Sequence, residues 1–153
     1  MAIQTVGIIG AGTMGNGIAQ ACAVSGINVV MVDISDTAVQ KGLSTVAGSL
    51  DRLIKKEKIS EADKAAALSR IKVSTSYDDL KAAQLVIEAA TENYDLKVKI
   101  LKQVDALVAP EVIVATNTSS ISITQLAAAT QRADRFIGMH FFNPVPMMAL
   151  VEI

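Results

Sequence analysis

Residues 5–21 read TVGIIGAGTMGNGIAQA, and this stretch decides the fold. The run from Thr5 to Ile9 is apolar like a buried strand, and helical spacing of apolar residues begins at Met14. Between them stands a G-x-G-x-x-G motif, Gly10-Ala11-Gly12-Thr13-Met14-Gly15. In a strand–turn–helix unit its glycines permit, in order, a tight turn, close approach to a pyrophosphate and close helix packing. The stretch therefore predicts a dinucleotide-binding unit, and the alternative is a glycine-rich turn with no ligand.

Further along the chain, strand-like and helix-like segments alternate. We expect strands at residues 28–32, 71–75, 84–90, 112–116, 136–140 and 149–153, and helices at 14–25, 37–58, 60–70, 96–108 and 121–129. This alternation predicts a Rossmann-type α/β fold, a doubly wound and mostly parallel sheet with helices on both faces. Repeats and Pro/Gly-rich linkers are absent from the sequence, so we expect residues 1–153 to form one domain.

Composition and charge exclude several classes of partner. Hydrophobic residues make up 51% and charged residues 19% of the 153, which indicates a globular protein. The formal net charge of −1 argues against a nucleic-acid partner, which requires a basic excess. No apolar run reaches the roughly 18 residues of a membrane span, and Met1 to Val6 lacks the basic start of a signal peptide. We therefore expect a cytoplasmic protein with no membrane partner.

The single cysteine, Cys22, cannot form an internal disulfide bond. It falls on the apolar side of the predicted helix at residues 14–25. We therefore expect a buried packing residue, and the alternative is a reactive thiol. We expect no metal ion.

Asp33 ends the second predicted strand and indicates which dinucleotide binds. An acid at this place accepts hydrogen bonds from the adenine ribose and repels a 2′-phosphate. The residues that follow, Ile34-Ser35-Asp36, include no Arg that would bind such a phosphate. The sequence therefore favours NAD over NADP.

Polar clusters follow three later strands. They are Glu88 to Glu92, Asn117 to Ser120, and the only histidine, His140. A single histidine at a strand end is as often a satisfied core residue as a catalytic one. In open α/β sheets, however, ligands bind outside the carboxyl ends of the strands, where all three clusters fall. We therefore expect them to form one site.

Several motifs together resemble a known family. They are the glycine motif at residues 10–15, Glu92-Asn93, Asn117-Thr118-Ser119-Ser120, His140-Phe141-Phe142-Asn143-Pro144 and Val151-Glu152-Ile153. In this order they are similar to the short-chain L-3-hydroxyacyl-CoA dehydrogenases, and the resemblance covers the whole chain. It implies NAD-dependent interconversion of (S)-3-hydroxyacyl-CoA and 3-oxoacyl-CoA, as in fatty acid or butanoate metabolism.

The resemblance implies a role for each matching residue. His140 is the general base in alcohol oxidation and the acid in reduction, which suits an imidazole because it exchanges protons near neutral pH. Glu152 pairs with His140, orients the ring and stabilises the imidazolium, as the acid of a Ser-His-Asp triad does. Ser119 binds the substrate oxygen beside His140.

The resemblance also implies cofactor and coenzyme A contacts. The cofactor contacts are Gly10, Ala11, Gly12, Thr13, Met14, Gly15, Asp33, Glu92, Lys97, Ser119 and Asn143. Ser49, Lys56 and Ser119 match positions that contact coenzyme A. The alternative for Lys97 is a solvated helix charge, and for Ser49 and Lys56, beside the basic run Lys55-Lys56-Glu57-Lys58, it is a solvated helix end.

Members of the family are about twice as long as this chain and carry a C-terminal helical domain that forms a homodimer. We expect that domain to be missing from this chain, and we therefore expect NAD binding with little turnover and an exposed apolar patch. Two other functions stay open. One is an NAD-binding module without catalysis, and the other is a dehydrogenase of a hydroxy acid that is not linked to CoA.

Overall fold

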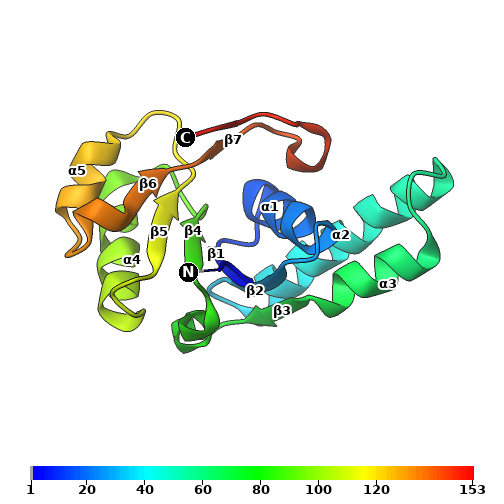
Figure 1. The fold of residues 1–153 in the computed structure, drawn as a ribbon, viewed down its shortest axis with the longest axis horizontal. Coiled ribbons are helices and arrows are strands. Elements are labelled where there is room, and N and C mark those ends of the chain that lie inside the picture. The colour runs from blue at the N-terminus through cyan, green and yellow to red at the C-terminus, as the bar shows by residue number, and fades with distance from the viewer. Residues whose placement is uncertain (1) are drawn as a thin grey trace.

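Six parallel strands form the central sheet of the computed structural model, which describes residues 2–153 (Figure 1). They are β1 (Thr5–Ile9), β2 (Asn28–Val32), β3 (Ile71–Ser74), β4 (Leu85–Glu88), β5 (Ile113–Thr116) and β6 (Phe136–Gly138). Their order across the sheet is β3-β2-β1-β4-β5-β6, and every pairing is parallel. This order reverses direction between β1 and β4, which opens a crevice at the carboxyl ends of the strands. The expected Rossmann-type α/β fold is confirmed.

Helices cover both faces of the sheet. They are α1 (Thr13–Val24), α2 (Asp36–Lys55), α3 (Glu61–Ser69), α4 (Tyr94–Leu107) and α5 (Ile123–Ala128). Alternate residues of a strand enter different cores, so that in β2 Met31 packs with α1 and α2 while Val30 packs with α4. Figure 1 shows α1, α2 and α3 at one end of the molecule and α4 and α5 at the other. Burial on both faces explains why the strands are continuous apolar runs.

The turn from β1 into α1 requires glycine at two positions. Gly10 has a φ of 107°, which a residue with a side chain rarely adopts. A Cβ on Gly15 would lie 1.7 Å from the Gly10 carbonyl oxygen. The helix can therefore start directly against the strand, as the first and last glycines of the motif predict.

Side chains cap most of the helices. Ser60 and Asp63 form the expected capping box at the start of α3. The expected start of α4 at Leu96 is wrong, because the Asn93 side chain accepts the Leu96 N–H at 3.0 Å and the helix begins at Tyr94. The sequence analysis also missed the 3₁₀ helix η1 (Tyr77–Ala82), which carries the buried Leu80.

The expected strand at residues 136–140 is two strands in different sheets. Strand β6 ends at Gly138, opposite Thr116, which is the last residue of β5. The Met139 N–H still donates to the Thr116 carbonyl oxygen at 3.0 Å, and the chain then leaves the main sheet. His140 instead begins β7 (His140–Phe141), which pairs antiparallel with β8 (Val151–Glu152). We call this two-stranded sheet the terminal ribbon; between its strands lie the cis Asn143–Pro144 bond and the 3₁₀ helix η3 (Val145–Met147).

Arg132 fixes the far end of α4. It lies in the loop before the 3₁₀ helix η2 (Ala133–Arg135), is 5% exposed and forms an ion pair with Asp105. Its guanidinium also donates to carbonyl oxygens at the end of the helix and beyond it, those of Asp105, Val108, Ala109 and Val112. A cation here satisfies carbonyls that have no helical partner.

Cys22 of α1 is partly buried and packs against the hydrophobic core. The expected packing role is borne out by this contact, although burial is not complete, and desolvation raises the pKa of the thiol to about 11, which argues against a reactive thiol. Among residues 2–153 no helix is both long and apolar enough to cross a bilayer.

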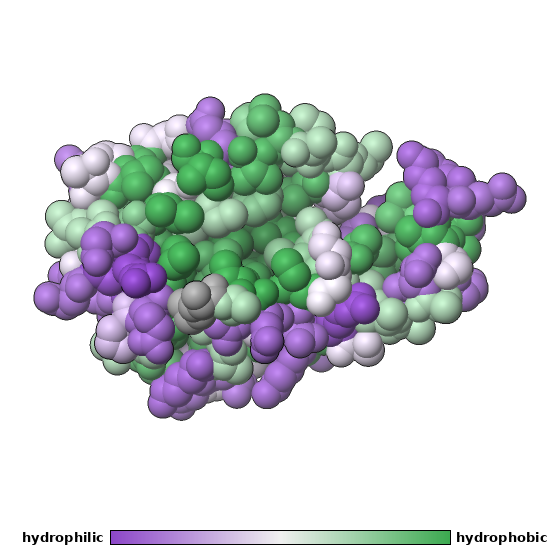
Figure 2. Space-filling view, viewed as in Figure 1, coloured by the Kyte–Doolittle hydropathy of each residue, from purple (hydrophilic) through white to green (hydrophobic). Residues whose placement is uncertain are grey.

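In the C-terminal segment, large hydrophobic side chains are exposed: Met147 is 74% and Ile153 77% exposed. Figure 2 shows hydrophobic residues along the upper edge of this face.

Candidate active site

Three contiguous pockets follow the carboxyl edge of the sheet. The first, of about 270 Å³, includes Gly12, Thr13 and Asp33 in its lining. The second, also of about 270 Å³, shares Gly12 and Thr13 and extends over residues 89–92. The third, of about 230 Å³, shares Met14, Glu92 and Asn117 with the second and ends at His140. Together they form one groove, from Asp33 to His140, which we call the cofactor groove.

The Asp33 end of the groove is built for a phosphate and a ribose. Asp33 Oδ2 accepts the Ala11 N–H at 2.8 Å, so the carboxylate lies against the glycine turn. A Cβ on Gly12 would meet no protein atom within 4 Å, and the backbone is therefore open to the groove. Helix α1 begins at Thr13 with neither a side-chain cap nor an acidic residue in its first turn. Its free N–H groups and positive dipole end suit a pyrophosphate.

The sequence analysis missed some of the residues that line this end. Asn16 of α1 and Ala38, Lys41 and Thr45 of α2 line the same pocket as Asp33. The three α2 residues are spaced by three and four positions, which places them on one helical face. This spacing, in a helix that begins at Asp36 only three residues after Asp33, is a signal in the sequence that could have identified these residues.

His140 and Glu152 face each other across the terminal ribbon. They are direct partners in the antiparallel register, and Nδ1 of His140 lies 3.9 Å from Oε1 of Glu152. The Glu152 side chain is 74% exposed, whereas that of His140 is 27% exposed. The imidazole also packs against Phe142, with ring centroids 4.6 Å apart. A carboxylate in this position can orient the ring and stabilise its protonated form.

The pocket at His140 collects most of the residues expected around the chemistry. Met14, Glu92, Asn117, Ser119 and Asn143 line it together with Phe141 and Phe142. Asn117 also accepts the Phe141 N–H at 2.9 Å, which ties the ribbon to the end of β5. A proton-exchanging group, a hydroxyl and amides therefore converge on one cavity.

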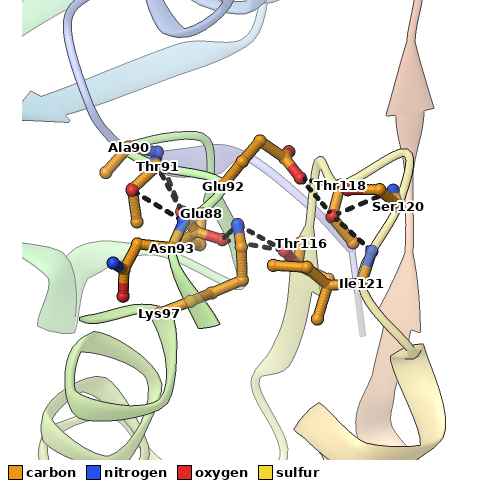
Figure 3. A network of polar contacts seen from close by, with 10 residues as sticks. All are labelled: Glu88, Ala90, Thr91, Glu92, Asn93, Lys97, Thr116, Thr118, Ser120 and Ile121. Atoms are coloured by element: carbon orange, nitrogen blue, oxygen red, sulfur yellow. Dashed lines mark hydrogen bonds and ion pairs between the residues drawn. The ribbon is translucent and has the colours of Figure 1, made fainter. Parts of the chain in front are cut away.

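Beneath the middle of the groove lies a polar network that joins the ends of β4 and β5 (Figure 3). Glu88 and Lys97, both with 0% exposed side chains, form an ion pair at its centre. The alternative of a solvated charge for Lys97 is therefore wrong. The ammonium bonds to protein groups, Glu88 and Thr116, and its contact with the cofactor stays a prediction.

Of the three residues matched to coenzyme A, Ser119 lines the groove, whereas Ser49 and Lys56 lie outside it. Ser49 is half-buried in α2, and Lys56 is the exposed residue that ends that helix. Neither residue lines one of the three pockets of the groove. A larger concavity of about 810 Å³ lies around Asp105 and Arg132 and includes no predicted site residue.

Comparison with known proteins gives consistent matches along the chain. The family model described as 3-hydroxyacyl-CoA dehydrogenase, NAD binding domain, matches residues 5–153. A 3-hydroxybutyryl-CoA dehydrogenase of Bradyrhizobium diazoefficiens is 51% identical over 99% of this chain and 52% of its own length. One from Clostridioides difficile is 46% identical over 95% of this chain and 52% of its own. The chain thus spans about half the length of these curated relatives.

A solved structure agrees in detail. The crystal structure of (S)-3-hydroxybutyryl-CoA dehydrogenase PaaH1 from Ralstonia eutropha is 81% identical, with a TM-score of 0.97. The match covers 98% of this chain and 53% of that one. Fold and sequence therefore point to the same family.

Proposed function

This chain belongs to the family of 3-hydroxyacyl-CoA dehydrogenase NAD-binding domains, and from that premise we propose that it binds NAD and supplies proton transfer for (S)-3-hydroxyacyl-CoA oxidation. The reverse reaction reduces a 3-oxoacyl-CoA such as acetoacetyl-CoA. The observation that carries the proposal is the His140–Glu152 pair at the end of a groove that starts at the glycine turn. A core histidine with no catalytic role would have no need of such a groove.

Each end of the groove has its own task in this proposal. Asp33 accepts hydrogen bonds from the adenine ribose, and the start of α1 binds the pyrophosphate. The chemistry that bound NAD would supply is acceptance of a hydride from C3 of the substrate. His140 takes the proton of the C3 hydroxyl on Nε2, since Nδ1 faces Glu152. Glu152 stabilises the imidazolium that results.

The remaining lining residues position the reactants. We propose that Ser119 donates to the substrate oxygen, because it shares the pocket of His140. Glu92, Met14 and Asn143 line the same pocket and are proposed to contact the nicotinamide side of the cofactor. Ser49 and Lys56 are proposed to contact coenzyme A, which the exposed basic run near Lys56 would favour through its phosphates.

Activity of the whole protein is part of the same proposal. The relatives are about twice as long as this chain, and we propose that the remaining length forms a helical, dimer-forming half that covers the acyl group. A dehydrogenase must hold its substrate in register and exclude water. We therefore expect NAD binding with weak turnover for residues 1–153 alone. We also propose a cytoplasmic location, in keeping with the lone unpaired Cys22.

The test is NADH oxidation with acetoacetyl-CoA, by this chain alone and mixed with the C-terminal half of the Ralstonia relative. Substituting His140→Ala should lower the rate by about 10²- to 10⁴-fold, the usual contribution of a general acid. Affinity for NADH should stay within about twofold, because the adenosine end of the groove is intact.

Two outcomes would favour the alternatives. NADH binding without any reaction, even in the mixture, would favour an NAD-binding module without catalysis. Reduction of free acetoacetate as fast as of acetoacetyl-CoA would favour a hydroxy acid that is not linked to CoA.

A further inference from the structure

We infer that Glu88 is a positioning residue, whose buried charge Lys97 neutralises, and that its carboxylate holds the groove wall at residues 89–92 and so sets affinity for the nicotinamide half of the cofactor. The inference rests on the proposed function. It differs from the direct cofactor contact expected for Lys97, because the ammonium is buried and acts through Glu88. It also assigns a role to Glu88, which the mechanism does not otherwise use.

The Glu88 carboxylate is shared between two parts of the protein. Its Oε1 takes the Lys97 ammonium and the Thr116 hydroxyl, the latter at 2.7 Å. Its Oε2 accepts the N–H groups of Ala90 at 2.8 Å and Thr91 at 3.4 Å. One oxygen is therefore anchored to α4 and β5, while the other holds the loop (Figure 3).

The loop at residues 89–92, which Glu88 holds, forms part of the cofactor groove. Ala89 to Glu92 line the middle of the groove opposite Gly12 and Met14. Glu92 accepts hydrogen bonds from Thr118 at 2.8 Å and Ser120 at 3.1 Å, the residues on either side of Ser119. The wall held by Glu88 is thus continuous with the pocket of Ser119 and His140.

Stability alone does not explain two charges buried here. A buried ion pair gains little over apolar residues of the same volume, because both charges must be removed from water. What an apolar pair cannot supply is an acceptor for the N–H groups of the loop. Asp33 holds the other end of the groove by a separate bond to Ala11, so the two halves of the site can be perturbed independently.

Two double variants of this chain separate the explanations. Glu88→Gln with Lys97→Met removes both charges but keeps an oxygen for the Ala90 N–H. Glu88→Leu with Lys97→Met removes the charges and that acceptor. Affinities are measured for NADH and for ADP-ribose, which is the cofactor without its nicotinamide.

We expect the Gln/Met variant to bind both ligands within about twofold of the unsubstituted chain. The Leu/Met variant should lose about tenfold for NADH, with ADP-ribose within about twofold. Asp105→Asn, which breaks the buried pair at the far end of α4, is the matched control. It should lower the melting temperature and leave the ratio of the two affinities unchanged.

Other outcomes overturn the inference. If the Leu/Met variant keeps the ratio of NADH to ADP-ribose affinity, whether both affinities hold or both fall equally, then Glu88 and Lys97 have only a structural role. A loss of NADH affinity in the Gln/Met variant would indicate a direct contact of the Lys97 charge with the cofactor. Failure of the unsubstituted chain to bind either ligand would instead overturn the proposed function.

Amide exchange gives a second measurement that needs no variant. If Glu88 holds the loop, the Ala90 amide exchanges with solvent much more slowly than that of Glu92, which belongs to the same loop. Equal exchange at the two positions would contradict the inference even if the double variants fail to fold.

Discussion

The two ends of the cofactor groove are built in different ways. At one end, Asp33 follows β2 in the interior of the main sheet, and its carboxylate bonds to the glycine turn at 2.8 Å. At the other, His140 belongs to a separate ribbon of two short strands, and its partner Glu152 is 74% exposed. The separation of 3.9 Å between Nδ1 and Oε1 is longer than a hydrogen bond.

This difference indicates which step depends on further contacts. The phosphate and ribose end is held by buried strands and by bonds that involve the backbone, so it is pre-formed. The ribbon is a two-stranded sheet, which is marginal by itself, and its carboxylate is screened by water. Cofactor binding should therefore tolerate changes around the ribbon, whereas proton transfer should not.

Among the variants that test this difference, the largest effect is expected for Glu152→Gln, assayed in the mixture with the C-terminal half of the relative. It removes the charge that stabilises the imidazolium, and kcat for acetoacetyl-CoA reduction should fall by about 10²-fold, less than for a buried triad acid because water screens Glu152. NADH affinity should not change. Glu111→Gln, on another exposed glutamate, is the control. An unchanged kcat would show that proton transfer does not depend on the Glu152 charge, and it would contradict the proposed difference between the two ends of the groove.

A smaller effect is expected at the glycine turn. Gly12→Ala adds a methyl group that meets no protein atom but enters the groove, so NADH affinity should fall about 30-fold while the melting temperature holds. Calorimetric titration measures the first and thermal unfolding the second. Gly48→Ala in the middle of α2 should raise stability and leave NADH affinity unchanged. Full NADH affinity in Gly12→Ala would mean that the pyrophosphate lies elsewhere.

The smallest effect concerns the choice of cofactor. Asp33→Asn keeps an oxygen for the Ala11 N–H and removes the charge that repels a 2′-phosphate. The preference for NADH over NADPH should narrow by about tenfold, as measured by the two dissociation constants. Asp36→Asn, on the exposed first turn of α2, tests whether any nearby acid has the same effect. Equal narrowing in both variants would contradict a specific role of Asp33.

The sequence predicted the main sheet well because each of its signals is local. An apolar run, a glycine turn and a cap such as Ser60 with Asp63 act over a few residues. The family resemblance predicted that Glu152 lies beside His140, and the two residues are register partners, but the strand of His140 was wrongly assigned to the main sheet. Where β5 ends depends on tertiary contacts between segments far apart in the chain, and no local pattern records that.

The burial of the Lys97 ammonium could not be predicted from the sequence either. Lys97 falls in a predicted helix five residues after Glu92, and nothing in the neighbouring sequence distinguishes a solvated ammonium from a buried one. Its partner Glu88 lies nine residues away at a strand end, and the third member, Thr116, lies on another strand. Such a cluster exists only after the sheet has brought β4 and β5 side by side.

Gly17 of α1 lets this helix pack closely against the loop between the two strands of the terminal ribbon. A Cβ at this position would lie 3.0 Å from the Cβ of Val145, the buried residue of η3 between the two ribbon strands. Glycine has no side chain and therefore leaves room for Val145 against the helix. Val145 would have to move by a few tenths of an ångström to make room for a methyl group there, and its loop joins the two strands that carry His140 and Glu152. A position outside the pocket of His140 thus helps to set how the terminal ribbon lies against α1.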